Sequence, residues 1–118
     1  MLRLGHLNIG VADIDQSCDF YGKWFGFDRL MAEYEDGTRF ITDASGFELG
    51  LHPGGSAGPG RDWHFGFIAS DPETVTDLMS AMTTSGLTIM EPENTGGYVG
   101  YKCEDPDGHT VEVYFEPR

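Results

Sequence analysis

An internal repeat constrains the fold of this chain more than any other feature of its sequence. The stretch HLNIGVAD runs from His6 to Asp13, and HFGFIASD runs from His64 to Asp71, 58 positions further along. In both copies a histidine opens an alternation of apolar residues, and an aspartate follows seven positions after it. A sequence that repeats at this spacing predicts two copies of one supersecondary unit.

A helix is predicted directly after each copy. The first begins at Asp13, whose side chain can cap the helix and which is followed by Gln16 three residues later. It ends at Gly26. The second begins at Asp71, with Pro72 in its first turn, and ends before Gly86. Both helices therefore have their two ends marked in the sequence.

Short apolar segments separated by Asp-Gly and other turn signals predict the strands. We expect strands near residues 3–11, 27–34, 38–42, 47–52, 63–69, 87–91, 97–104 and 110–116. Each half then has the order β-α-β-β-β. The predicted fold class is α+β, with two tandem βαβββ modules forming a curved mixed sheet around a central cavity and the helices outside.

The chain length indicates one domain. A chain of 118 residues is large enough for a single core. We expect module one over about 1–53, a glycine- and proline-rich linker over 54–62, and module two over about 63–118.

Charge and composition exclude several classes of partner. The net charge of −13 repels nucleic acid and anionic membrane surfaces, so neither is expected to bind. Apolar runs are too short to span a bilayer and no signal sequence is recognisable, which predicts a cytoplasmic protein. The two cysteines lack CxxC spacing, and neither is expected to be catalytic.

Strand parity brings three potential metal ligands to one face. In the last predicted strand Val111 and Val113 face the helices, which leaves Glu112 on the opposite, open face. The same parity puts His6 and His64 on the open face. Two imidazoles and a carboxylate that converge on a cleft are typical of a divalent-metal site for Fe(II), Mn(II), Zn(II) or Ni(II).

Several motifs resemble one superfamily over essentially the whole chain. They are the two histidine-led repeats, the segment DFYGKWFGF (Asp19 to Phe27) and the segment EDPDGHTVEVYF (Glu104 to Phe115). Together they resemble the vicinal oxygen chelate superfamily, which includes glyoxalase I, extradiol dioxygenases, fosfomycin-resistance proteins and bleomycin-binding proteins. The DPDGH turn followed by a strand and a glutamate is the most specific of these elements.

The resemblance implies a metal site and a class of substrate. His6, His64 and Glu112 fall on the family's metal-ligand positions. One divalent metal ion would bind two oxygens of a small-molecule substrate and stabilise the charge that develops there. The resemblance also implies a homodimer.

The family's fourth ligand position allows two alignments. Aligning the glycines of the two modules puts Gly50 opposite Glu112, whereas aligning their prolines puts Glu48 there. We favour Gly50, because it keeps the flanking apolar residues in phase, and so expect three protein ligands. Glu48 and His52 remain candidates for a fourth ligand or a general base.

Other polar and aromatic residues are candidates for lining the substrate cavity: Asn8, Trp63, Tyr98, Tyr101, Lys102 and Tyr114. Tyr101 and Lys102 are neighbours in one strand, so they must face opposite ways. His109, in an Asp-Gly turn, is expected to be a surface residue.

Two functions are consistent with these features. The first is a metal-dependent enzyme of glyoxalase or dioxygenase type, with isomerase, lyase or dioxygenase chemistry. The alternative is a metal-free protein that binds an antibiotic or another small molecule, as bleomycin-resistance proteins do. The complete set of three ligand positions favours the enzyme.

Overall fold

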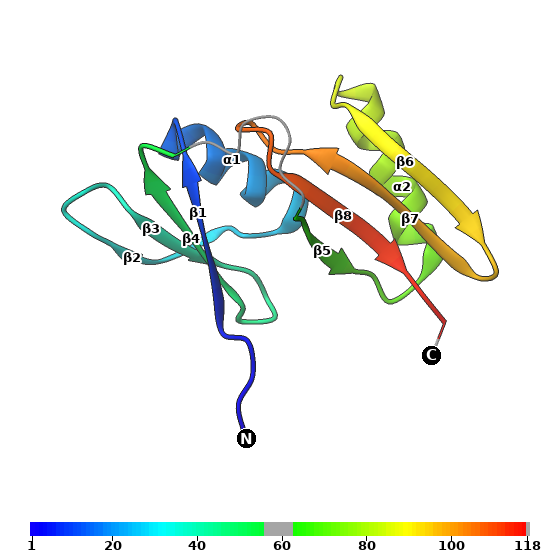
Figure 1. Ribbon diagram of the computed structural model, residues 1–118, viewed down its shortest axis with the longest axis horizontal. Helices are drawn as coiled ribbons and strands as arrows, with labels where there is room; N and C mark the ends of the chain where they lie inside the picture. Colours follow the sequence, from blue (N-terminus) through cyan, green and yellow to red (C-terminus); the bar gives the residue numbers. More distant parts are fainter. Residues whose placement is uncertain (56–62, 118) are drawn as a thin grey trace. The chain divides into compact units, whose positions relative to one another are not determined.

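The computed structural model describes residues 1–55 and 63–117 (Figure 1). Residues 56–62, which are most of the predicted linker, lie outside the described residues. The chain divides into two compact units, Met1–Ala57 and Gly58–Arg118. No helix among the described residues is long and apolar enough to cross a bilayer.

The first unit is a four-stranded mixed sheet with one helix. Its strands are hydrogen-bonded in the order β1-β4-β3-β2, with β1 parallel to β4 and the other pairs antiparallel. Helix α1 packs against β4. The elements are β1 (His6–Val11), α1 (Ile14–Phe25), β2 (Arg29–Glu33), β3 (Arg39–Thr42) and β4 (Glu48–Pro53).

The second unit repeats this topology. Its sheet has the order β5-β8-β7-β6, and again only the first pair, β5 with β8, is parallel. Helix α2 packs against β6, β7 and β8 (Figure 1). The elements are β5 (Phe65–Ile68), α2 (Pro72–Thr84), β6 (Ile89–Thr95), β7 (Tyr98–Glu104) and β8 (Thr110–Phe115). The predicted pair of βαβββ modules is confirmed.

Capping residues set the ends of both helices as predicted. The Asp13 carboxylate accepts a hydrogen bond from the Gln16 amide at 3.0 Å, and the Asp71 carboxylate accepts one from the Thr74 amide at 2.7 Å. Gly26 ends α1 with a φ of 75°, a left-handed conformation that favours glycine. Each repeat therefore turns from strand to helix at its aspartate.

The core of each unit lies between its helix and its sheet. Most strand residues that face the helix are buried in both units, whereas Phe65 and Phe67 of β5 are half-buried, and the predicted parity of the strands is confirmed. The first core contains Ile9, Val11, Tyr21, Phe27, Ile41, Leu49 and Leu51, and the second contains Val75, Met82, Tyr101, Cys103, Val111 and Val113. The opposite face of each sheet carries the polar candidates.

Strand register supports the favoured alignment of the two modules. Asn8, two residues after His6, pairs with Gly50. Gly66, two residues after the histidine of the second repeat, pairs with Glu112. Gly50 therefore occupies the position in the first unit that the glutamate occupies in the second.

Gly10 of β1 gives a test of backbone packing in the first unit. A Cβ atom at this position would lie 2.8 Å from the Gly55 Cα, and backbone cannot move aside as a side chain can. Gly10→Ala is expected to lower the free energy of unfolding by about 1–3 kcal/mol, measured by urea denaturation. Gly5→Ala is the control, because no atom lies within 4 Å of its added Cβ. Equal losses in the two variants would contradict this packing.

Candidate functional site

The second unit brings two of the three predicted ligands together. His64 directly precedes β5, and Glu112 lies on the neighbouring strand β8, where it pairs with Gly66. The Nε2 atom of His64 lies 2.9 Å from the Oε1 atom of Glu112. Their side chains are 42% and 19% exposed, so the pair is open to a ligand from the solvent side.

Tyr98 of β7 completes this cluster. Its hydroxyl donates a hydrogen bond to the Oε2 atom of Glu112, so both oxygens of the carboxylate have a protein partner. Burial and the neighbouring carboxylate raise the pKa of Tyr98 above its ordinary value. The phenol therefore remains a hydrogen-bond donor at neutral pH.

The donor chemistry of the pair suits a divalent metal. Imidazole nitrogen and carboxylate oxygen bind such ions at about 2.0–2.2 Å, so two of them at right angles around one ion lie about 3 Å apart. The 2.9 Å between His64 and Glu112 is an ordinary hydrogen-bond length, and it is also compatible with that separation. Among the described residues, however, no group of three or more His, Cys, Asp or Glu side chains that could hold a metal is assembled. The third predicted ligand, His6, lies on β1 of the first unit.

Lys102 lies beside Glu112 on the same face of the sheet. The two residues are paired across β7 and β8, and the Lys102 ammonium lies 3.3 Å from the Glu91 carboxylate. Tyr98, Lys102 and Glu112 line one small pocket of about 100 Å³. A cationic side chain is thus available next to the candidate metal ligands.

Tyr101 differs from the prediction that it lines the cavity with its side chain. Although it forms part of the wall of the same small pocket, it is only 1% exposed. Its hydroxyl donates to the Met82 sulfur at 3.4 Å, on the helix side of the sheet. The alternation of β7 explains the difference, because Lys102 faces the open side and its neighbour must face the core.

The aromatic candidates Trp63 and Tyr114 have different surroundings: Tyr114 contacts Tyr98 of the cluster, whereas Trp63 packs with Phe65 and the buried His109. Tyr114 of β8 stacks on Tyr98 at 6.1 Å between ring centroids, and Trp63 lies 6.3 Å from the Phe65 ring.

His109 was expected at the surface, but it is 4% exposed. The turn folds it inward, because the Asp105 carboxylate accepts a hydrogen bond from the amide of His109 at 2.8 Å.

The remaining candidates share the open face of the first unit. His6 pairs with Glu48 across β1 and β4, and its ring lies 5.8 Å from that of Phe40. The Oδ1 atom of Asn8 lies 2.5 Å from the Nδ1 atom of His52. The structure therefore brings Asn8 and His52 into direct contact, whereas it gives no such contact between Glu48 and His52.

An aromatic ring takes the place of a carboxylate at Gly50. Phe40 is its partner on β3, and a Cβ added to Gly50 would lie 2.8 Å from the Phe40 ring. The first unit therefore has no ligand at the position that corresponds to Glu112. This ring could not be predicted from the sequence, because only the β3–β4 register places it against Gly50.

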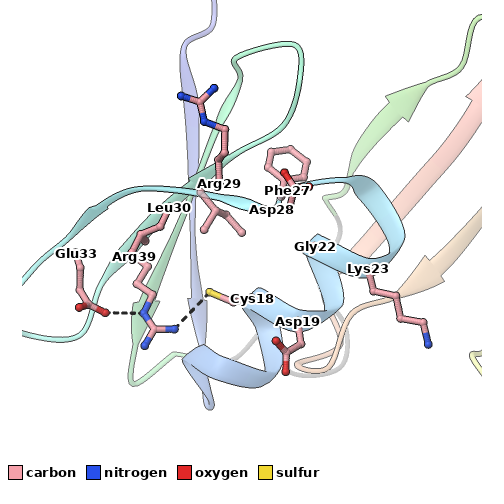
Figure 2. Close-up of a pocket in the computed structure, with 11 residues that line it drawn as sticks. Cys18, Asp19, Gly22, Lys23, Phe27, Asp28, Arg29, Leu30, Glu33 and Arg39 are labelled. Atoms are coloured by element: carbon pink, nitrogen blue, oxygen red, sulfur yellow. Dashed lines mark hydrogen bonds and ion pairs between the residues drawn. The ribbon is translucent and has the colours of Figure 1, made fainter.

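A second hollow, unrelated to the predicted ligands, lies on the helix side of the first unit (Figure 2). It has a volume of about 640 Å³ and lies between α1 and strands β2 and β3. Arg39 crosses it, with its guanidinium 2.7 Å from Glu33, 2.8 Å from Asp15 and 3.8 Å from the Cys18 sulfur. Sequence analysis missed this cluster, since its members come from three elements.

The two thiols are expected to differ in reactivity. Burial raises the pKa of the Cys18 thiol and raises that of Cys103 from 9.0 to about 12. In the native protein at neutral pH, Cys18, which is partly exposed, should react slowly with a thiol reagent, and Cys103, which is buried, should not react. Mass spectrometry after timed labelling checks both.

Arg39→Met should slow the labelling of Cys18 further, because the guanidinium lowers the thiol pKa and favours the thiolate. Arg29→Met, which changes the same hollow away from the sulfur, is the control (Figure 2). Faster labelling of Cys18 in Arg39→Met than in Arg29→Met would contradict this role of Arg39.

Comparison with known proteins places the fold and the sequence in one family. The model of the Glyoxalase/Bleomycin resistance protein/Dioxygenase superfamily matches residues 3–113. The chain belongs to this superfamily, and the resemblance inferred from its motifs is confirmed.

Individual relatives are distant in sequence and similar in fold. A trivalent organoarsenical cleaving enzyme from Bacillus sp. (strain MD1) is 22% identical over 119 residues, covering 97% of this chain and 73% of the relative. The structure of a possible glyoxalase from Bacillus cereus is 26% identical, with a TM-score of 0.81, and 96% and 98% of the two chains are covered.

A fosfomycin resistance protein, FosX from Listeria monocytogenes, has the same fold and was solved with Mn(II) and a sulfate ion. It is 18% identical, with a TM-score of 0.84, over 99% of this chain and 92% of its own. The family thus includes enzymes and resistance proteins.

Proposed function

We propose that this chain is a divalent-metal-dependent enzyme of glyoxalase or dioxygenase type, acting on a small molecule with two neighbouring oxygens. The observation that carries the proposal is the contact of 2.9 Å between His64 and Glu112 on the open face of the second unit. His6, the counterpart of His64 in the first repeat, is the proposed third ligand, supplied by the same chain or by a second copy in a homodimer.

A bound metal ion would polarise the substrate oxygens as a Lewis acid. The chain's own side chains would then orient the substrate and move its protons. Lys102 can attract an anionic group, since it pairs with Glu112 across β7 and β8 and lines the same small pocket. On the open face of the first unit, His52 or Glu48 is the proposed general base, and Asn8 orients the His52 ring through their contact of 2.5 Å.

Arsenic chemistry is not part of the proposal. Soft thiolate ligands are what a trivalent arsenical would require. The sequence has two cysteines, Cys18 and Cys103, which are 85 positions apart (103 − 18), and the second is buried with a pKa of about 12. The ligand set of nitrogen and oxygen atoms fits substrates that bind through oxygen.

One observation favours the alternative, a metal-free protein that binds an antibiotic or another small molecule. Both oxygens of Glu112 already have protein partners, His64 and Tyr98, so the carboxylate is satisfied without a cation. In that case the His64–Glu112 pair would be an element of the binding wall.

Metal analysis separates the two functions. The purified chain is stripped with a chelator, incubated with Fe(II), Mn(II), Zn(II) or Ni(II), desalted and analysed for bound metal. The enzyme proposal predicts about one ion per chain and a clear loss in His6→Ala. His109→Gln is the matched histidine control, because His109 lies buried in its turn.

A chain that binds none of these ions would refute the enzyme proposal and support metal-free binding. Substrate screening with the metal-loaded chain, with and without oxygen, then distinguishes dioxygenase chemistry from isomerisation or lysis.

A further inference from the structure

Tyr98 and His64 each contact a different oxygen of the Glu112 carboxylate. Oε1 faces the His64 Nε2 atom at 2.9 Å, and Oε2 accepts the hydrogen bond of the Tyr98 hydroxyl. The Glu112 side chain is only 19% exposed, so its orientation is determined by these neighbours rather than by water.

The backbone of β7 is built to let the Tyr98 ring reach this carboxylate. Lys102, not Tyr98, is the direct partner of Glu112, so the ring must extend along its own strand across Gly100. A Cβ at Gly100 would lie 2.5 Å from the Tyr98 hydroxyl oxygen and 2.8 Å from Cζ. Stacking on Tyr114 at 6.1 Å and 20° supports the ring.

The first unit has no equivalent of this arrangement. Gly50 takes the place of the glutamate there, and the Phe40 ring, which has no hydroxyl, occupies the space above it. The phenol–carboxylate contact is therefore not a packing feature of the repeated fold. It occurs in the unit that carries Glu112.

We infer that Tyr98 is a positioning residue that holds Glu112 as a ligand through one oxygen, Oε1, for the proposed metal. Carboxylates bind divalent metals through one oxygen or through both. A phenol that donates to Oε2 disfavours metal binding through that oxygen, so Oε1, on the His64 side, is the favoured ligand atom. One more coordination position then stays open, which suits a substrate that binds through two oxygens. This inference rests on the proposed function.

Tyr98→Phe tests this role directly, because it removes the hydroxyl and keeps the ring. Co(II) is titrated into the metal-stripped chain, and both the affinity and the visible absorption spectrum are recorded. Hydrogen-bonding partners of metal ligands contribute about 10–100-fold to affinity, so we expect a loss of about tenfold or more. The spectrum should also change, since Glu112 becomes free to bind through both oxygens.

Gly100→Ala is a second variant that should act in the same direction. It keeps the phenol but displaces its hydroxyl, because the added Cβ would lie 2.5 Å from that oxygen. Tyr101→Phe is the control on the same strand, since it removes a hydroxyl that contacts Met82 on the opposite side of the sheet. Circular dichroism and urea unfolding verify that all variants are folded.

The possible outcomes are distinguishable. A wild-type chain that binds no metal overturns the proposed function and this inference together. A wild-type chain that binds Co(II), with the same affinity and spectrum in Tyr98→Phe, overturns this inference alone. Equal losses in Tyr98→Phe and Tyr101→Phe also overturn it, because they would reflect general destabilisation.

Discussion

Alanine in place of Glu112 or His64 is expected to lower the affinity of the chain for Mn(II) or Co(II) by more than about a hundredfold. Even partners that only hydrogen-bond to a metal ligand contribute about 10–100-fold, so the loss of a ligand itself should exceed that range. The two atoms that would contact the metal lie 2.9 Å apart, and removing either leaves the other without its partner. Isothermal titration calorimetry measures the affinities.

Glu104→Gln is the matched control for this prediction. Glu104 is the last residue of β7 in the same sheet, where it pairs with Thr110 of β8 rather than with the candidate ligands. The affinity of the Glu104→Gln variant for the metal should stay within about twofold of that of the wild type. If Glu104→Gln loses as much affinity as Glu112→Ala, binding would reflect the charge of −13 and not a specific site.

The two-module architecture could be predicted because its signals are local. Asp13 and Asp71 mark the helix starts through hydrogen bonds to amides three residues away, and the alternation of each strand shows which side chains face the core. The same alternation placed His64 and Glu112 on one face. That β5 and β8 are neighbours is a finding of the structure.

Contacts that depend on register could not be predicted. Tyr98 reaches Glu112 only because Gly100 lies between them, and the offset of β7 against β8 is not written in either strand alone. Tyr101 and Lys102 were expected to face opposite ways, but which of the two faces the core was unknown until the register was known. The Tyr98–Glu112 contact and the orientation of Lys102 both depend on the pairing of β7 with β8.

Tertiary packing accounts for the other differences. His109 is buried because its backbone amide donates a hydrogen bond to the Asp105 carboxylate within the turn. The Trp63 ring lies 6.0 Å from the His109 ring. Arg39 joins Asp15 and Cys18 of α1 to Glu33 of β2, and these two elements are distant from each other in the sequence. Hydropathy patterns identify a buried face, but they do not identify which polar residues meet across it.

The core of the second unit gives the largest expected loss of stability. Met82 of α2 is fully buried, with 0% exposed, and its sulfur lies 3.4 Å from the Tyr101 hydroxyl of β7. Met82→Ala should lower the free energy of unfolding by about 2–5 kcal/mol, because it leaves a cavity and removes the partner of a buried hydroxyl. Urea denaturation measures the loss. Met79→Ala, at a half-buried position on the same helix, should lose less.

Met82→Ala should lower stability without changing metal affinity. The reason is that Tyr101 of β7 faces the core, whereas its neighbour Lys102 faces the candidate site. A metal that binds only the folded chain stabilises it by an amount set by its concentration and affinity. Saturating Mn(II) should therefore raise the unfolding free energy of Met82→Ala and of the wild type equally. A smaller gain in Met82→Ala would mean that the α2 core also positions the ligands, and that the two faces of the sheet are coupled.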